Sequence, residues 1–133
     1  FARMMPHLDR LRPAKGRLLD VGTAAGAFLK AASDDGWDGT GIEPNAWLAD
    51  WGRTEYGVTI HVGSIDTVSV TPGFDVVTLW DVIEHTTDPA AVLARCVARL
   101  APSRALPRRA RGCRAPRLRI LDRPRTRAPD WLR

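Results

Sequence analysis

The segment that most constrains the fold is LLDVGTAAG, residues 18–26, where an apolar run ends in an acid and opens into small residues. The apolar run is typical of a buried strand. Gly22 and Gly26 allow the backbone to turn sharply and to approach a ligand closely, and the alanines between them keep the surface of the turn low. We therefore predict a strand, a nucleotide-binding turn and a helix in direct succession.

Four apolar segments, each bounded by Gly, Pro or Asp, are typical of strands. They are residues 18–22, 39–43, 58–62 and 74–80. Helical patterns separate them at residues 27–33 and 45–56, the second beginning at Asn45 and ending at Gly57. Alternating strands and helices predict an α/β fold with a Rossmann-like, doubly wound parallel sheet, of which the strand order 3-2-1-4 is present.

A third helix is predicted after the fourth strand. Asp88 is a good N-cap and Pro89 suits the first helical position. The spacing of the following apolar residues predicts one buried face, formed by Leu93, Cys96, Val97 and Leu100.

Charge divides the chain near Pro102. Residues 1–102 carry nine basic and thirteen acidic side chains, whereas residues 103–133 carry eleven arginines and two aspartates. The second part is dominated by Arg, Ala and Pro, without strand alternation and with four prolines. We expect an acidic domain in residues 1–102 and, in residues 103–133, an aberrant or disordered tail that builds no packed sheet and forms at most short helical turns near Leu118.

Composition excludes several classes of protein. The two cysteines, Cys96 and Cys113, provide neither a disulfide framework nor a metal-binding spacing, so no metal is expected. No apolar run approaches the roughly 18 residues of a membrane span, and the N-terminus lacks the pattern of a signal peptide. A soluble, cytoplasmic protein without a membrane span is predicted, and no particular oligomeric state is indicated.

The candidate site follows from the predicted sheet. Ligands of an open parallel sheet bind beyond the carboxyl ends of its strands. The residues at three of these ends are Asp20, Gly22 and Gly26 after the first strand, Glu43 after the second, and Trp80 and Asp81 after the fourth. The two oxygens of the Glu43 carboxylate match the adjacent hydroxyls of a ribose.

A dinucleotide-binding fold would also place an acid about 20 residues after its glycines. The glycine pattern of the turn must therefore distinguish a dinucleotide site from other nucleotide sites. Read as G-x-G-x-x-G from Gly22, the pattern departs at Ala24 and Ala27, whereas G-x-G-x-G departs only at Ala24. The second pattern fits better and does not require close approach of a pyrophosphate. A nicotinamide-dependent dehydrogenase stays open as the alternative.

The chain resembles the class I methyltransferases that use S-adenosylmethionine. The turn at residues 18–26 resembles their first motif, GIEPN at residues 41–45 their second, and FDVVTLWDVIEHTTDP at residues 74–89 the motif after their fourth strand. The last stretch is the most specific and looks like the branch that includes ubiquinone and menaquinone O-methyltransferases. The resemblance covers about residues 18–102.

This resemblance implies S-adenosylmethionine as the cofactor and assigns residues to it. The assignments are Asp20, Gly22, Thr23, Ala24 and Gly26 around the methionine part, Glu43 at the ribose, Ser64 and Ile65 beside the adenine with Asp66 as a further candidate, and Trp80 and Asp81 near the sulfonium. The sulfonium is already an activated donor, so transfer to a small-molecule acceptor, with oxygen as the first choice, needs chiefly alignment.

His85 is the candidate general base for a hydroxyl acceptor, since it is the only histidine placed just past the fourth strand. The alternative is that Glu84 and His85 only order the loop ahead of Asp88.

The resembled family should have a glycine turn and a fifth strand after the third predicted helix, and LAPSRALPRRARG begins this pattern and then loses it. We hypothesise that the chain is truncated or frameshifted after about Pro102, because GC-rich DNA read out of frame yields Arg, Ala, Pro and Gly. The fourth strand would then be an unprotected edge. A basic nucleic-acid-binding tail is the alternative, but no specific nucleic acid is expected because aromatic residues are not interleaved.

Overall fold

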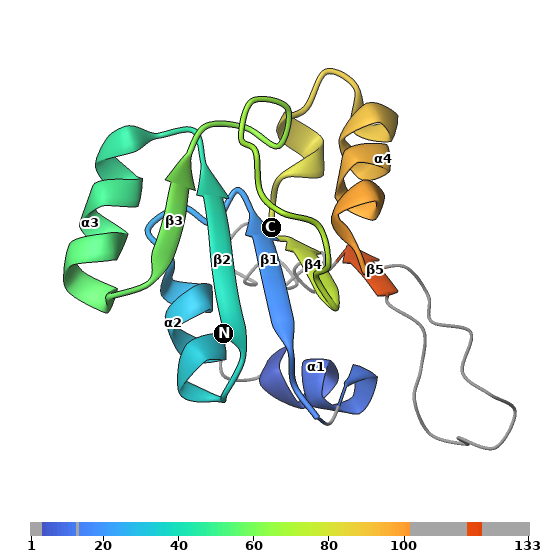
Figure 1. Cartoon of the computed structure of the whole chain (residues 1–133). Coiled ribbons are helices and arrows are strands. Elements are labelled where there is room, and N and C mark those ends of the chain that lie inside the picture. The colour runs from blue at the N-terminus through green and yellow to red at the C-terminus, as the bar shows by residue number, and fades with distance from the viewer. Residues whose placement is uncertain (1–3, 13, 102–116, 121–133) are drawn as a thin grey trace, which may run out of the picture.

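The computed structural model describes residues 4–12, 14–101 and 117–120, which form one parallel sheet with helices on both faces (Figure 1). Its five strands run in the order β3-β2-β1-β4-β5. They are β1 (Arg17–Val21), β2 (Asp38–Glu43), β3 (Thr59–Val62), β4 (Val76–Leu79) and β5 (Arg117–Ile120). The predicted α/β class and the predicted strand order 3-2-1-4 are confirmed.

The three predicted helices begin and end close to the predicted residues, and they are α2 (Ala27–Asp34), α3 (Ala46–Tyr56) and α4 (Pro89–Arg99). The structure adds α1 (Met5–Leu11) and the 3₁₀ helix η2 (Ile83–His85). The Asn45 side chain accepts a hydrogen bond from the Leu48 amide and so caps α3, which ends at Gly57 with a left-handed φ of 65°. The Asp88 side chain caps α4 by accepting from the Ala91 amide.

The sheet separates two apolar cores. One core contains buried side chains of α1, α2 and α3 packed on the sheet, among them Leu8, Phe28 and Ala49. The other lies under α4 and contains Phe74 and Cys96. A doubly wound sheet of this kind buries both faces, so the ends of its strands are the natural place for a ligand.

Helix α1 was not predicted. Pro6 lies in its first turn, where a missing amide hydrogen costs nothing, and Met5 and Leu8 are buried against the first core. Lys15 forms ion pairs with Asp9 of α1 and Asp35 after α2. The helix therefore closes one end of the first core.

Strand β5 shows that the prediction for the arginine-rich segment was wrong: the segment adds a strand to the sheet, and the residues around Leu118 are extended rather than in short helical turns. Residues 117–120 pair in parallel with β4, with Val76 opposite Arg117 and Leu79 opposite Ile120. The sequence there is RLRI, which alternates arginine with an aliphatic residue and contains no proline, so all four amide donors are available for pairing. The remainder of residues 102–133 lies outside the described residues.

The predicted apolar face of α4 was wrong in part. Cys96 is buried and Leu100 packs on the second core as expected, but Val97 is 52% exposed and Val92 takes its place. Positions 92, 96 and 100 follow one another at four-residue spacing, which puts Val97 about 100° further around the helix. None of the helices in residues 4–12 and 14–101 is long and apolar enough to cross a membrane.

Candidate functional site

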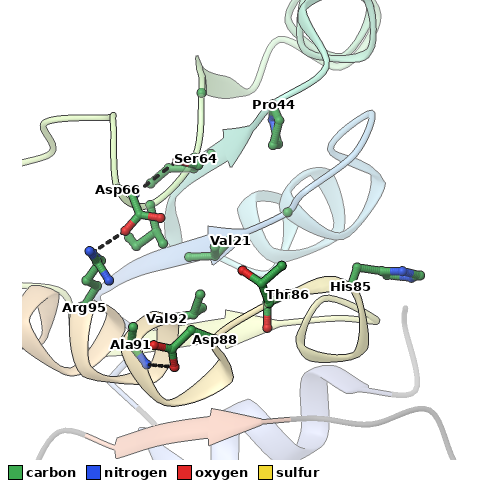
Figure 2. A pocket seen from close by; sticks show the side chains of 15 residues that line it. Val21, Pro44, Ser64, Asp66, His85, Thr86, Asp88, Ala91, Val92 and Arg95 are labelled. Carbon is green, nitrogen blue, oxygen red and sulfur yellow. Dashed lines mark hydrogen bonds and ion pairs between the residues drawn. The ribbon is translucent and has the colours of Figure 1, made fainter.

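A pocket of about 540 Å³ lies where the sequence predicts a ligand, at the carboxyl ends of β1, β2 and β3 (Figure 2). Its opposite wall is formed by the segment from η2 into the first turns of α4. Cavities that hold small molecules and cofactors have volumes of roughly 300–1,000 Å³. The pocket is therefore large enough for a nucleoside-sized ligand.

Five of the predicted site residues line this pocket. They are Gly22, Ser64, Ile65, Asp66 and His85, which come from three different segments of the chain. The predicted residues outside the lining are Asp20, Thr23, Ala24, Gly26, Glu43, Trp80 and Asp81. The predicted adenine-side residues and His85 are thus brought together around one cavity, whereas the other predicted residues are not part of its lining.

The α4 wall was missed by sequence reasoning. The additional lining residues there are Thr86, Thr87, Asp88, Ala91, Val92 and Arg95. The signal was present, because the predicted start of this helix at Asp88 is the next helix start after the fourth strand. A helix that starts at the carboxyl edge presents its first turns to the ligand side of the sheet.

The glycine turn after β1 is held by backbone geometry and by packing. The amides of Gly22 and Thr23 both donate to the Ile42 carbonyl of β2, at 2.8 and 3.1 Å. Gly22 has a φ of 73°, and a Cβ at this position would lie 2.5 Å from the Val82 side chain. Gly22 is therefore required both by its left-handed conformation and by its close neighbour.

Glu43 connects this turn to the start of α3. Its side chain is 8% exposed, and its Oε2 accepts from the Ala24 amide at 2.8 Å while its Oε1 accepts from the Asn45 amide at 2.8 Å. Each carboxylate oxygen has a second lone pair, so this arrangement leaves acceptor capacity for a ligand hydroxyl. The carboxylate is thus fixed in place before any ligand arrives.

Asp20 lies under the turn and is 1% exposed. Its Oδ1 accepts from the Thr78 hydroxyl at 2.7 Å, and its Oδ2 has no hydrogen-bond partner within the described residues. Burial raises the pKa of Asp20 to about 7; the Thr78 and Thr23 hydroxyls oppose this rise, and the negative charge of Glu43 adds to it. A carboxyl with this pKa changes its charge near neutrality.

Trp80 and Asp81 follow β4. The Trp80 ring packs edge-on against Phe28 of α2, with ring centroids 5.0 Å apart, and so joins the border of the first core. Asp81 has a left-handed φ of 52°, an unfavourable conformation that turns the chain toward η2. Neither residue is part of the pocket lining.

Two charged side chains meet at one end of the pocket. Nε of Arg95 on α4 forms an ion pair with Oδ1 of Asp66, which follows β3 (Figure 2). His85 lies at the opposite side of the pocket in the same view and is exposed. The pocket is therefore charged at one end and carries an imidazole at its other rim.

These features define a class of protein. A parallel sheet with a glycine turn after its first strand, a fixed carboxylate after its second and a pocket across the strand ends is a doubly wound α/β domain built to bind a nucleotide-like ligand. Residues 1–106 match the family model described as "Methyltransferase domain". The chain belongs to this methyltransferase-domain family, as its resemblance indicated.

Similar proteins agree with this membership. The chain is 32% identical over 100 residues to a ubiquinone biosynthesis O-methyltransferase of Xanthomonas axonopodis pv. citri (strain 306), covering 70% of this chain and 42% of that protein. It is 34% identical over 87 residues to the protein of the same name from Methylococcus capsulatus (strain ATCC 33009 / NCIMB 11132 / Bath), covering 60% and 37%. The chain thus spans about two-fifths of the length of these relatives.

Among solved structures, the chain is similar to the SAM-bound amino pentose methyltransferase CalS10 from Micromonospora echinaspora. The TM-score is 0.66 at 28% sequence identity, over 77% of this chain and 45% of that chain. The predicted Rossmann-like fold is therefore found in a methyltransferase of known structure.

Proposed function

We propose that the chain is the cofactor-binding part of an enzyme that transfers a methyl group from S-adenosylmethionine to an oxygen atom of a small-molecule acceptor. The observation that carries the proposal is the pocket, because segments of all three family-like motifs converge on it or on the turn beside it. The choice of oxygen is supported by the names of the ubiquinone biosynthesis O-methyltransferases. Membership of the methyltransferase family favours this function over a dehydrogenase.

The residues present fit this cofactor. Ser64, Ile65 and Asp66 would border the adenine, and the fixed carboxylate of Glu43 would accept from the ribose hydroxyls. The Oδ2 of Asp20, which has no hydrogen-bond partner among the described residues, suits a water that bridges to the ammonium group of the methionine part.

The rest of the turn would shape the methionine end of this site. The residues concerned are Gly22, Thr23, Ala24 and Gly26, with Trp80 and Asp81 beside the sulfonium. A pocket with several polar groups in fixed positions orients a ligand without reorganisation, which is the main requirement of a transfer that depends on alignment.

The chemistry is a displacement at one carbon. When bound, S-adenosylmethionine supplies a methyl group on a positively charged sulfur, so that the new oxygen–carbon bond forms as the carbon–sulfur bond breaks. We assign His85 the role of accepting the proton of the acceptor hydroxyl, because its ring lies at the pocket rim away from Asp66 and is open to solvent. The acceptor proton leaves on the imidazole, and water then removes it.

The small-molecule acceptor, a cytoplasmic location and the absence of a specific nucleic-acid partner remain predictions from the sequence. Salt-dependent nucleic-acid binding that disappears when residues 103–133 are deleted would contradict the last of these.

The proposal is tested by calorimetric titration of the 133-residue chain with S-adenosylhomocysteine. Ala91 lines the pocket in the first turn of α4, whereas its neighbour Ala90 is exposed and lies outside the lining. We expect Ala91→Leu to fill the pocket and to raise Kd at least about ten-fold, and Ala90→Leu, the matched control, to leave Kd unchanged. Both substitutions keep good helix formers in α4.

Two results would contradict the proposal. The first is no binding by a chain whose folding is shown by cooperative unfolding; the second is equal binding by both leucine variants. A parallel titration with NADH tests the dehydrogenase alternative, which requires NADH to bind more tightly than S-adenosylhomocysteine.

A further inference from the structure

A buried acidic group lies next to the pocket lining. Asp20 is on β1, which runs between β2 and β4 in the middle of the sheet (Figure 1). The next two residues along the chain, Val21 and Gly22, both line the pocket. The Asp20 side chain itself is only 1% exposed. A carboxyl that bulk water does not reach is thus one residue away from the place where a ligand would bind.

The immediate surroundings of Asp20 provide hydroxyl groups. Its register partners are Gly41 on β2, which has no side chain, and Thr78 on β4, whose hydroxyl donates to Oδ1 at 2.7 Å. None of the ion pairs between described residues includes Asp20. Its Oδ2 has no hydrogen-bond partner among those residues either. Within the described part of the chain, the charged form of this group is therefore stabilised by neutral donors and not by a cation.

The charge that acts on Asp20 from the neighbouring elements is negative. Burial raises the pKa of Asp20 to about 7, and the carboxylate of Glu43 at the end of β2 adds to this rise. The side chains that α2 and α3 bury on this side of the sheet, among them Phe28 and Ala49, are apolar. A cation brought in by a ligand would therefore change the balance between the two forms of Asp20.

The two ligands of the proposed site differ by one positive charge. S-adenosylmethionine carries a sulfonium, whereas S-adenosylhomocysteine, the product of methyl transfer, carries a neutral thioether in the same place. A positive charge near a buried carboxyl favours the ionised form of that carboxyl, and the effect is larger in the protein interior than in water. The cofactor should therefore lower the pKa of Asp20 more than the product does.

We propose that Asp20 determines the preference of the site for the cofactor over its product: its carboxyl gives up a proton when the sulfonium-bearing cofactor binds and regains it when the neutral product takes the cofactor's place. This inference rests on the proposed function, which places the methionine part beside the glycine turn. The proton passes to water and returns from water, so no other reactant is needed. By linkage, the site favours the cofactor more strongly as the pH rises through neutrality, and inhibition by the product is strongest at low pH.

The test is calorimetric titration of the full chain with each of the two ligands, in phosphate and in Tris buffer. These buffers differ in their heat of ionisation, so the difference between the two heats of binding gives the number of protons released. At pH 7 we expect the cofactor to release about half a proton more than the product. The ratio of the product Kd to the cofactor Kd should rise about five-fold to ten-fold from pH 5 to pH 8.

Substitutions at Asp20 and Thr78 assign this proton. Asp20→Asn cannot ionise, so it should abolish the extra proton release and make the ratio of the two Kd values independent of Asp20 titration. Any contribution from the ligands' own groups is the same in both proteins and cancels. The Thr78 hydroxyl opposes the rise in the pKa of Asp20. Thr78→Val should therefore move the midpoint of the pH profile to higher pH, and Thr78→Ser, which keeps the hydroxyl, should restore it; this pair tests the proposal independently of the folding of Asp20→Asn.

Two control variants exclude other groups. Asp38→Asn, at a side chain of β2 that is 77% exposed, is the matched control and should keep the extra proton release. Histidine also changes charge near neutrality, and His85 lines the pocket. In His85→Gln the difference in proton release between the two ligands should persist, because the account assigns it to Asp20.

Three outcomes overturn the role of Asp20 while the proposed function stands, since both ligands still bind. They are equal proton release by the two ligands, a difference that survives in Asp20→Asn, and a pH profile that Thr78→Val leaves in place. If the folded, unaltered chain binds neither ligand, the proposed function fails, and the role of Asp20 fails with it.

Discussion

Replacement of Asp20 by Asn tests whether the buried carboxyl under the glycine turn makes stability depend on pH. Burial raises the pKa of Asp20 from 3.8 to about 7. The folded chain therefore binds this proton more tightly than the unfolded chain does. Stability from this group is highest below the unfolded pKa of 3.8, falls as the pH rises, and is fully lost only above the folded pKa of about 7.

The magnitude follows from the size of the shift. Three pKa units correspond to about 4 kcal/mol in the free energy of unfolding above pH 7. Between pH 5 and pH 8 the unaltered chain should lose about 3 kcal/mol from this group alone. Asn cannot ionise, so the Asp20→Asn variant should lack that loss, although its unpaired amide costs about 1–3 kcal/mol at every pH.

The assay is urea unfolding of both proteins at half-unit steps from pH 5 to pH 8, followed by circular dichroism. The difference between the two free energies should move by about 3 kcal/mol in favour of Asn as the pH rises. Asp38→Asn, at a side chain that is 77% exposed, is the control and should keep the pH dependence of the unaltered chain. Parallel pH profiles for Asp20→Asn and the unaltered chain would refute the reasoning.

Four further substitutions test the packing around the site, each by urea unfolding. Ala24 has a left-handed φ of 50°, so Ala24→Gly should stabilise the chain by about 1 kcal/mol. A loss of stability in this variant would contradict the inference that the backbone at Ala24 is strained. A Cβ at Gly52 would lie 2.4 Å from the Ala25 carbonyl oxygen, so Gly52→Ala should cost about 2 kcal/mol. At Gly57 an added Cβ would meet no atom within 4 Å, so Gly57→Ala should cost only the backbone strain of about 1 kcal/mol. Equal losses of stability in the two glycine variants would contradict the clash inferred at Gly52. Thr78→Val removes the hydroxyl that bonds the buried carboxyl of β1 and should cost about 1–3 kcal/mol at pH 8, whereas no change there would contradict the bond's contribution.

The strands, helix caps and strand order followed from local signals. The apolar run before Gly22 predicted β1, and Asn45, Gly57 and Asp88 marked helix ends where the structure has them. These signals are local because a cap or a left-handed glycine satisfies backbone groups within one turn.

Strand β5 could not be predicted in the same way. Its four residues lie in an arginine-rich segment, and a parallel strand is defined by pairing with a distant partner, here β4. The composition of residues 103–133 is an average over the whole segment. It therefore does not reveal the alternation of arginine and aliphatic residues at positions 117–120. The hypothesis of a frameshift after Pro102 stays a prediction, and resequencing the gene in independent isolates would test it.

The part of the site at the strand ends could be predicted from the sequence, whereas the opposite wall of the pocket, formed by α4, could not. Ser64, Ile65 and His85 line the cavity, because each follows a strand. The partnership of Asp66 with Arg95 was out of reach, since it joins residues 29 positions apart on two elements whose packing only the tertiary structure shows.

The most direct test of the central claim is hydrogen exchange of the backbone amides of the full chain with and without S-adenosylhomocysteine. The account predicts slower exchange at residues 22–26, 63–66 and 85–88, which surround the pocket or form the turn beside it, and no change in α1. Protection confined to other segments, or none at saturating ligand in a folded chain, would contradict the assignment of this pocket to the cofactor.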